Sequence, residues 1–398
     1  MIKISLERAA RNPAASLSLP ELPFEADGME IARRTISNWP GYAPSPIRDL
    51  SDLAAELDLG KIWFKDESVR FGLGSFKPLG GAFAVSRALS RHLAGETGSE
   101  APDLLSSDMK ARVASLTVTA ATDGNHGRSV AWGARMFGCR CVIFVCSSVS
   151  QQRKDAIASY GAEIRQVDGS FDDAVRMADQ TARKEGWFVI PDTSDGETVI
   201  APRDVTQGYM LMVDEALEQL KGEPPVTHIF LQAGVGGMAS ASAARFWQAY
   251  GDKRPVTTIV EPEKCACWYE SLVAGKPVAV TGDIDSAMAG LSCGEVSLIA
   301  WPVLETGADF MVTLNDDAVP VMMRYLAGRG GDDRPVIAGE TGISGLAGLV
   351  AAAQDEALRK EMGLGPDSHV FVVNSEGDTD PDAYKTIVGK SASEVLGQ

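Results

Sequence analysis

The strongest constraint on the fold is the alternation of short apolar strands with longer helical segments. Residues 115–121 read Ser-Leu-Thr-Val-Thr-Ala-Ala, a β-branched run typical of a strand buried on both faces. Comparable runs cover residues 140–146, 162–168, 187–190, 227–231, 256–260 and 370–373, and a short strand is expected to end at Phe64. Buried strands that alternate with helices form parallel sheets flanked by helices. The sequence therefore predicts an α/β fold with parallel-rich sheets.

The length of the chain permits two domains. It has 398 residues, of which 45% are hydrophobic, and this is enough for a large core. We expect a smaller α/β domain over residues 88–220. This domain would be inserted into a larger one built from residues 1–87 and 221–398.

Lys77 lies where a loop is expected to pass into a helix. Pro78 suits the first helical position, and Gly80 and Gly81 allow a backbone or a flat ligand to come close. Partial burial and the helix N-terminus both disfavour the charged form of such a lysine. A neutral amine is what a Schiff base requires. The alternative is a solvated surface lysine beside a helix start.

A second cluster, residues 122–127, follows the strand at 115–121 and reads Thr-Asp-Gly-Asn-His-Gly. A glycine-bearing turn at a helix start gathers backbone N–H groups into an anion site, here for the carboxylate of an amino acid. Asn125 can hydrogen-bond a ring hydroxyl, and Asp123 is a potential general base. An Asx turn at Asp123 is the structural alternative, and for His126 we favour a structural, helix-capping role.

A third cluster, residues 232–239, reads Gln-Ala-Gly-Val-Gly-Gly-Met-Ala between a predicted strand and a predicted helix. Small side chains before a helix N-terminus form a phosphate cradle. Gly234, Gly236 and Ala239 also satisfy the dinucleotide fingerprint, with Glu261 about where a ribose-binding acid belongs. A dinucleotide-dependent oxidoreductase is therefore the competing hypothesis for this loop.

Together these motifs resemble the fold-type-II pyridoxal phosphate enzymes, which are similar to the β-subunit of tryptophan synthase, and within that group the diaminopropionate ammonia-lyase family. The resemblance spans about residues 40–385 in family order. It rests on Tyr42–Ile47, Lys65–Lys77, Ala121–Gly127, Asp192–Ser194, Gln207–Tyr209, Gly234–Gly237, Val260–Pro262, Met288–Glu295, Gly339–Gly342 and Asn374–Pro381. The Asp-Gly-Asn-His-Gly and Ser-Glu-Gly-Asp-Thr-Asp runs separate this family from ordinary serine or threonine dehydratases. They leave the dinucleotide hypothesis remote.

The resemblance implies a role for each matching residue. Lys77 would form the Schiff base with pyridoxal phosphate, and Asp123 and Asp192 would act as bases from opposite faces of the substrate. The other cofactor contacts would be Asn125 at the ring oxygen, Gly234, Val235, Gly236, Gly237 and Met238 at the phosphate, Glu340 beside the ring and Ser375 at the pyridine nitrogen. The substrate carboxylate would meet Ser75, Thr122 and Gly124. For Ser375, a turn position before Gly377 is the alternative.

The reaction implied by the resemblance is the α,β-elimination of D- and L-2,3-diaminopropionate to pyruvate and ammonia by way of aminoacrylate. The cofactor would lie in a cleft between the predicted domains, with Lys77 and residues 234–237 on the larger one. After Asp192-Thr-Ser194 the family commonly has Trp-Glu-Gly-Tyr, whereas this chain has Asp195-Gly-Glu-Thr198. This departure leaves open an elimination from a 3-hydroxy amino acid or from one with a larger β-substituent.

Charge and hydropathy narrow the partners. The net charge of −17 argues against nucleic acid or an anionic membrane. No stretch reaches the roughly 18 apolar residues of a membrane helix, and the N-terminus lacks the long apolar core of a signal peptide. We therefore expect a cytoplasmic protein acting on a small amino acid, and the resemblance implies a homodimer.

The six cysteines do not suggest a disulfide framework in a chain of this length. Cys139, Cys141 and Cys146 lie on or beside a predicted buried strand, where they are expected to be core thiols. Cys265, Cys267 and Cys293 are candidates to come together, but a zinc site needs a fourth ligand that the sequence does not offer, so we expect no metal.

Overall fold

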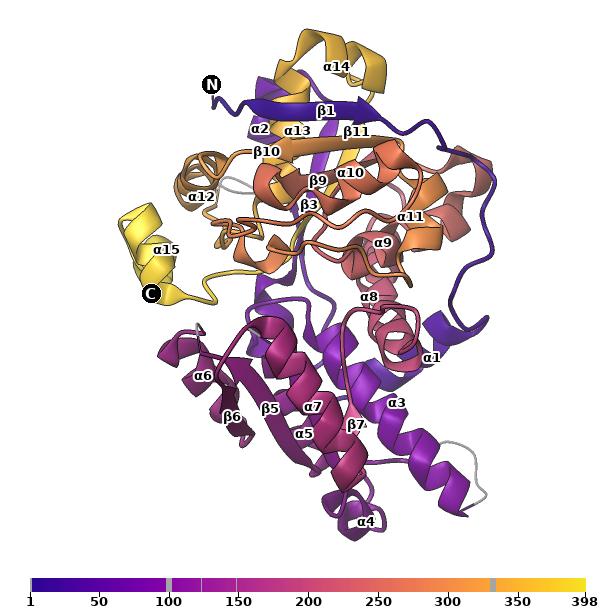
Figure 1. Ribbon diagram of the computed structural model, residues 1–398. Coiled ribbons are helices and arrows are strands. Elements are labelled where there is room, and N and C mark those ends of the chain that lie inside the picture. The colour runs from indigo at the N-terminus through magenta and orange to yellow at the C-terminus, as the bar shows by residue number, and fades with distance from the viewer. Residues whose placement is uncertain (1, 98–101, 123, 148, 330–333) are drawn as a thin grey trace. The chain divides into compact units, whose positions relative to one another are not determined.

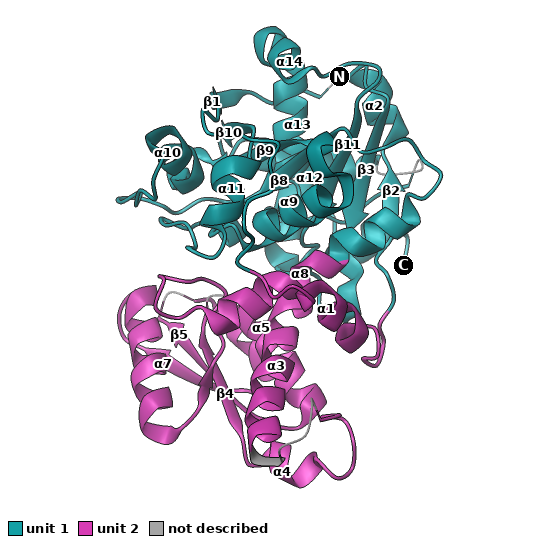
Figure 2. Cartoon of the chain, turned by 90° about the vertical axis from the view of Figure 1, so that its right-hand side faces the viewer, with its two compact units in different colours: residues 1–23, 43–76, 212–398 teal, residues 24–42, 77–211 magenta. Residues whose placement is uncertain are grey.

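The computed structural model describes residues 2–97, 102–122, 124–147, 149–329 and 334–398. The chain divides into two compact units, which Figure 2 shows in different colours. Unit 1 comprises Met1–Pro23, Ala43–Phe76 and Met212–Gln398, and unit 2 comprises Phe24–Tyr42 and Lys77–Leu211. These bounds differ from the expected domains in three places. One of them is residues 212–220, which were expected in the smaller domain and belong to unit 1.

The first difference concerns the helix that follows Lys77. Helix α3 (Pro78–Thr97) belongs to unit 2, whereas the sequence analysis placed Lys77 and most of this helix's first turns in the larger domain. It packs closely on α5 (Asn125–Phe137), because a Cβ atom at Gly133 would lie only 2.8 Å from Cα and Cβ of Ala82. This close helix contact binds α3 to unit 2.

The second difference is the segment Phe24–Tyr42, which the sequence analysis assigned to the larger domain. It contains α1 (Gly28–Ile36) and is anchored to unit 2 by Trp39. The Trp39 ring meets the rings of Trp132 and Phe137 edge-on, with centroids 6.0 and 5.9 Å apart. Buried aromatic contacts of this kind hold a short segment that has little other core of its own.

A seven-stranded sheet forms the core of unit 1, with the order β1-β10-β9-β8-β11-β3-β2. Figure 1 labels β1, β10, β9, β11 and β3, and Figure 2 also labels β8 and β2. The inner strands run parallel, while β1 and β2 pair antiparallel at the two edges. The strands are β1 (Leu6–Arg11), β2 (Ile47–Asp49), β3 (Lys61–Asp66), β8 (His228–Gln232), β9 (Val256–Pro262), β10 (Phe310–Leu314) and β11 (His369–Asn374). The sequence analysis predicted β3, β8, β9 and β11 but not the other three.

Helices and short 3-10 turns surround this sheet. The helices are α2 (Ser51–Glu56), α9 (Gly237–Tyr250), α10 (Cys267–Ala274), α11 (Trp301–Gly307), α12 (Ala318–Gly328), α13 (Ser344–Gln354), α14 (Glu356–Met362), α15 (Pro381–Val388) and α16 (Ala392–Leu396). The 3-10 turns are η1 (Glu67–Gly72), η2 (Gly251–Lys253), η3 (Glu263–Cys265) and η4 (Ala289–Leu291).

Helix α13 is the most deeply buried helix segment of unit 1, with nearly every residue out of contact with solvent. It lies directly on the sheet, since a Cβ at Gly345 would be 2.7 Å from Phe230 O. One at Gly348 would be 2.6 Å from Cγ2 of Val260. Small residues at these two positions therefore set the distance between helix and sheet.

Unit 2 is built on a four-stranded sheet of order β6-β5-β4-β7, in which all neighbours run parallel. Its strands are β4 (Thr117–Ala121), β5 (Arg140–Cys146), β6 (Glu163–Val167) and β7 (Phe188–Val189). Its other helices are α4 (Lys110–Ala114), α6 (Gln151–Ala158) and α7 (Phe171–Glu185), and α8 (Ile200–Gln219) begins in unit 2 and ends in unit 1. The predicted α/β class with parallel-rich sheets is confirmed.

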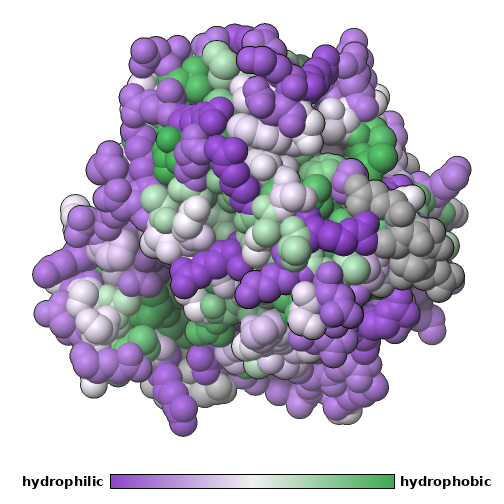
Figure 3. Space-filling view, turned by 90° about the horizontal axis from the view of Figure 1, so that it is seen from below, coloured by the Kyte–Doolittle hydropathy of each residue, from purple (hydrophilic) through white to green (hydrophobic). Residues whose placement is uncertain are grey.

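Polar residues predominate on the surface, and the apolar residues of the chain supply the core. Hydrophilic residues cover most of the face in Figure 3, and hydrophobic residues form separate groups between them. None of the helices in the described ranges is long and apolar enough to cross a membrane. Cys139, Cys141 and Cys146 are buried free thiols, as predicted, and burial raises the pKa of Cys139 to about 12.

Candidate active site

The glycine loop Gly234–Gly237 joins β8 to α9 in unit 1. Gly236 has a φ of +98°, a conformation that glycine alone adopts without strain. A Cβ at this position would also lie 2.3 Å from Cζ2 of Trp268. The first N–H groups of α9, including that of Met238, have no acceptor within a helix and can hold an anion. The loop thus has the form of the predicted phosphate cradle.

Ser375 follows β11 and is tied to the strand that leads into this loop. Gln232 Nε2 donates to Ser375 Oγ at 2.9 Å and to Val373 O at 3.0 Å, and Gln232 and Ser375 are buried. Because a carbonyl only accepts, the second bond fixes which end of the amide faces Ser375. The Ser375 hydroxyl accepts here, so its own hydrogen remains to be donated to another acceptor.

The loop before Lys77 pairs with the same strand end. Phe76 N donates to Ser375 O at 3.1 Å, and Ser75 forms an isolated antiparallel bridge with Glu376. Lys77 is the next residue of the chain. The covalent chain therefore places the backbone of Lys77 one residue from the Ser375 contact.

Glu340, predicted to line the cofactor ring, stands before Thr341 in the loop that precedes α13. Thr341 O accepts from Gln232 Nε2 at 3.4 Å, and Thr341 N donates to Glu376 Oε1 at 3.2 Å. The side-chain amide of Gln232 therefore binds both the backbone next to Glu340 and the side chain of Ser375. Within unit 1 the structure brings together the glycine loop, Glu340, Ser375 and Ser75.

In unit 2, Lys77 is paired with Asp192. Lys77 Nζ donates to Asp192 Oδ2 at 2.7 Å, and the two side chains are 23% and 27% exposed. Burial tends to raise the pKa of Asp192, but the Lys77 ammonium and the nearby His126 outweigh it and hold this pKa well below its usual range. An ionised carboxylate thus lies against the amine predicted to form the Schiff base.

Two further side chains lie beside this pair, and the sequence analysis assigned neither to the site. His126 Nε2 is 2.7 Å from Ile190 O, which only accepts, so Nε2 carries a proton; its Nδ1 is 3.8 Å from Asp192 Oδ2. Tyr209, a buried residue, lies close enough to Lys77 and Asp192 to interact electrostatically with both, and burial raises the pKa of its hydroxyl. Both residues lie in runs that the family resemblance covers, 122–127 and 207–209, where the sequence favours a capping role for His126 and indicates no role for Tyr209.

The turn after β4 is organised by its own side chain. Gly124 N and Gly127 N donate to Thr122 Oγ1 at 3.1 and 3.2 Å. The Gly124 N–H, predicted to meet the substrate carboxylate, thus has an acceptor inside the turn. Asn125 begins α5 and is partly exposed, which leaves its predicted role a prediction. Asp123, the predicted second base, lies outside the described residues.

Glu261 has a different use from the one that the dinucleotide hypothesis required. It is 1% exposed, and its two oxygens accept from Trp268 N and Tyr269 N, each at 2.8 Å. Burial raises the pKa of Glu261 to about 8, although the two backbone donors lower it. A carboxyl group that is buried and bound to the first N–H groups of α10 is out of reach of a ribose, which argues against that hypothesis.

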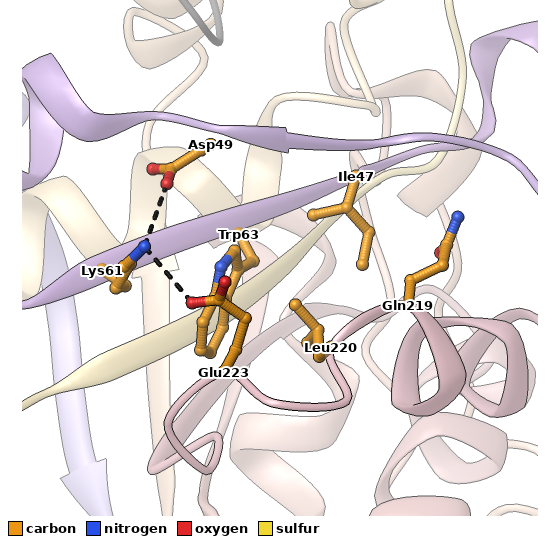
Figure 4. A pocket seen from close by; sticks show the side chains of 7 residues that line it. All are labelled: Ile47, Asp49, Lys61, Trp63, Gln219, Leu220 and Glu223. Atoms are coloured by element: carbon orange, nitrogen blue, oxygen red, sulfur yellow. Dashed lines mark hydrogen bonds and ion pairs between the residues drawn. The ribbon is translucent and has the colours of Figure 1, made fainter.

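A hollow of about 290 Å³ opens beside β2 and β3 of unit 1 (Figure 4). It is lined by Ile47, Asp49, Lys61, Trp63, Gln219, Leu220 and Glu223. Lys61 Nζ lies 3.4 Å from a carboxylate oxygen of both Asp49 and Glu223. None of these residues is a predicted site residue, so the hollow is separate from the candidate site. In the described part of the chain no three His, Cys, Asp or Glu side chains are grouped to hold a metal ion.

Comparisons with known proteins agree with this arrangement. The model of the family "Pyridoxal-phosphate dependent enzyme" matches residues 39–376. The diaminopropionate ammonia-lyase of Escherichia coli is 39% identical over 381 residues, which cover 93% of this chain and 94% of that protein. That of Salmonella typhimurium is 38% identical over 364 residues, covering 89% of this chain and 90% of that protein.

Solved structures give the same result. The Escherichia coli diaminopropionate ammonia-lyase in complex with an aminoacrylate-PLP azomethine reaction intermediate matches with a TM-score of 0.87 and 35% identity, over 98% of this chain and 100% of that one. Its complex with D-serine matches equally well. By sequence and by fold, the chain belongs to the diaminopropionate ammonia-lyase family of pyridoxal-phosphate-dependent enzymes.

Proposed function

We propose that the protein uses pyridoxal phosphate to eliminate ammonia from 2,3-diaminopropionate, and that it accepts both the D and the L enantiomer as substrates. The observation that carries the proposal is the ion pair between Lys77 and Asp192. Lys77 directly follows Phe76, whose backbone N–H donates to Ser375 O. A reactive amine, a proton acceptor and a hydroxyl donor are thereby supplied by one short stretch of chain and its partners.

The unit 1 residues fit the phosphate and ring of this cofactor. The glycine loop presents backbone without side chains at the N-terminus of α9, where a phosphate can be bound, and the Ser375 hydroxyl has a hydrogen to donate to a pyridine nitrogen. When bound, pyridoxal phosphate supplies a carbonyl for amines and an electron sink for the substrate α-carbon. A hydroxyl at the ring nitrogen, unlike a carboxylate, leaves the ring less electron-withdrawing, which suits a β-elimination.

Lys77 has two neighbours that control its proton. Its amine must be neutral to act as a nucleophile, and the Asp192 carboxylate, 2.7 Å away, is positioned to take the proton. The buried Tyr209 hydroxyl lies near the same pair. With its partner lysine engaged elsewhere, Asp192 becomes free to accept the α-proton of a substrate.

Elimination from both enantiomers requires bases on opposite faces of the substrate. We assign Asp192 to one face and keep Asp123 as the proposed base for the other. Asn125 at the ring oxygen and Ser75, Thr122 and Gly124 at the substrate carboxylate also stay as proposals. The free product, aminoacrylate, reacts with water to give pyruvate and a second ammonia.

The Asp195–Thr198 loop supports a second candidate, the elimination from a 3-hydroxy or larger β-substituted amino acid. Asp195 Oδ1 accepts from Glu197 N at 2.9 Å and from Thr198 N at 3.2 Å, which makes a compact turn without aromatic side chains. The family commonly has two aromatic residues here. D-serine is also a ligand of the Escherichia coli enzyme.

The test is the release of pyruvate and ammonia from D- and L-2,3-diaminopropionate, with D- and L-serine and threonine alongside. Rapid release from both diamino enantiomers is expected. Turnover of the hydroxy amino acids alone would replace the first candidate with the second. A colourless protein, with no turnover of any of these amino acids in added pyridoxal phosphate, would contradict both.

The proposal extends to assembly and location. We propose a homodimer in the cytoplasm, as expected from the resemblance and the sequence. Light scattering of the purified protein at working concentration gives the mass that tests the homodimer. Fractionation of the producing cells tests the cytoplasmic location.

A further inference from the structure

Two carbonyl groups of the glycine loop are held by donors on its far side. Trp268 Nε1 donates to Gly234 O at 2.9 Å, and Ser297 N donates to Val235 O at 2.9 Å. In a trans peptide the C=O of one residue and the N–H of the next point in opposite directions. Holding these two carbonyls back therefore aims the N–H groups of Val235 and Gly236 at the opposite side, the side that α9 leaves open to an anion.

Trp268 is itself held on three sides. Glu261 accepts from its backbone N–H, and Trp301 stacks on its ring with centroids 6.0 Å apart and planes 17° apart. The edge of the indole lies against Gly236, where any side chain would collide with it. The residue is fully buried, so this position is not shared with water.

We propose that Trp268 is a positioning residue for the cofactor phosphate, which fixes the peptide between Gly234 and Val235 so that its N–H faces the phosphate. This inference rests on the proposed function, because it takes the glycine loop to be the phosphate site. Without the indole N–H, the Gly234 carbonyl loses a buried donor and the peptide is free to turn its N–H away. The loss of this hydrogen bond is expected to weaken binding of the cofactor's phosphate and not binding of its ring.

The chain supplies a matched control in Trp247 of α9. Its Nε1 also donates to a backbone carbonyl, that of Leu17 at 3.1 Å, and it is 1% exposed. Trp268→Phe and Trp247→Phe therefore each remove one indole N–H from a partly buried hydrogen bond to a backbone carbonyl and leave an aromatic ring. Only the first removal affects the glycine loop.

The experiment removes the cofactor from the full-chain holoenzyme and measures the dissociation constants of pyridoxal phosphate and of pyridoxal, which lacks the phosphate, by absorbance. For Trp268→Phe the constant for pyridoxal phosphate is expected to rise about fivefold, the change expected for one neutral hydrogen bond, while that for pyridoxal stays the same. Trp247→Phe should change neither constant, although its thermal midpoint falls. The ³¹P signal of the bound phosphate should shift in Trp268→Phe only.

Three outcomes overturn the inference. An unchanged constant for pyridoxal phosphate in Trp268→Phe, or an equal rise for both compounds, shows that Trp268 does not act through the phosphate. Equal binding of the two compounds by the wild type removes the phosphate site itself, and with it this part of the proposed function. If Trp268→Phe does not fold, Trp301→Leu, which removes the stacked ring and keeps the indole N–H, is expected to show a rise of about twofold for pyridoxal phosphate alone.

Discussion

Two lysine–carboxylate pairs in this chain look alike in distance and differ in everything around them. In unit 1, Lys65 Nζ donates to Glu215 Oε2 at 2.9 Å, and in unit 2, Lys77 Nζ donates to Asp192 Oδ2 at 2.7 Å. Lys65 is fully buried and also donates to Ser45 O and to the side chain of Gln219. Lys77 is 23% exposed. The Lys65 ammonium donates to three protein acceptors inside the core, whereas the Lys77 ammonium is partly open to solvent.

The surroundings of the unit 1 pair extend this difference. Arg70 donates to both Glu67 and Glu215, and all three side chains are buried. Burial lowers the pKa of Lys65 against the opposing pull of Glu67 and Glu215. A network of buried charges in balance is costly to break and unsuited to chemistry. Partial exposure, and not the pairing itself, distinguishes the lysine proposed to bind the cofactor from the buried one.

The largest effect should come from replacing Lys77. Lys77→Ala removes the amine proposed to bind the cofactor carbonyl, so turnover is expected to fall by about a thousandfold or more. The thermal midpoint of the protein should change little, because the side chain is partly exposed. Elimination assays and calorimetry on the same preparation check both parts. Substantial activity in this variant would contradict the assignment of Lys77.

Asp192→Asn should follow, with a loss that depends on the enantiomer. The amide keeps the shape but does not accept a proton, so kcat with one enantiomer should fall by roughly a hundredfold or more. The other enantiomer should keep most of its rate if Asp123 serves it. Separate kcat values for D- and L-2,3-diaminopropionate measure this. An equal loss for both would mean that the two aspartates do not divide the work by face.

Glu215→Ala should have the opposite profile, with a loss of stability and not of chemistry. It leaves Lys65 and Arg70 buried without one of their carboxylates, which is expected to lower the free energy of unfolding by about 3–5 kcal/mol. Turnover per folded molecule should be kept at temperatures where the variant is folded. Urea unfolding and rates normalised to folded protein distinguish the two. A variant as stable as the wild type would show that the network contributes little.

The smallest effect is expected from pH. The folded-state pKa of Asp192 is lowered below the roughly 3.9 of an unfolded aspartate, so its ionised form stabilises the fold above that value. This contribution, about 1 kcal/mol for a partly exposed pair, is lost as the pH falls through 4 toward the folded pKa. Urea unfolding of protein freed of cofactor, between pH 6 and 3, should show the wild type losing its advantage over Asp192→Asn. A constant difference across this range would rule the effect out.

Local patterns were enough to predict the inner strands β3, β8, β9 and β11 of unit 1 and the strands of unit 2, but not the inner strand β10. The roles of the site residues stay predictions. The apolar run ending at Ala121 and the Gly234–Gly237 loop each carry their structure in adjacent residues. The edge strands were missed for a physical reason. β1 alternates partly buried and exposed residues, several of them charged, and β2 has only three residues, so neither resembles a buried strand until a neighbour pairs with it.

The contacts that arrange the site were beyond the sequence because they join distant residues. Gln232 and Ser375 are 143 positions apart, and Trp268 and Gly234 are 34 apart. The local sequence pattern around one of these residues does not identify its distant hydrogen-bond partner. The same holds for Tyr209 beside Lys77, since a tyrosine in a helical run is most often core. The residue types of the site were readable, while the bonds that orient them required the fold.

Helix α13 has a consequence for how far this protein can drift in evolution. Its glycines at 345 and 348 are pressed against the sheet so closely that even a methyl group would collide with Phe230 or Val260. Almost any substitution there moves the helix off β8 and β9, and β8 is the strand that leads into the glycine loop. We expect neutral variation to accumulate in the exposed terminal helices, and random mutagenesis followed by selection for growth to leave α13 nearly untouched.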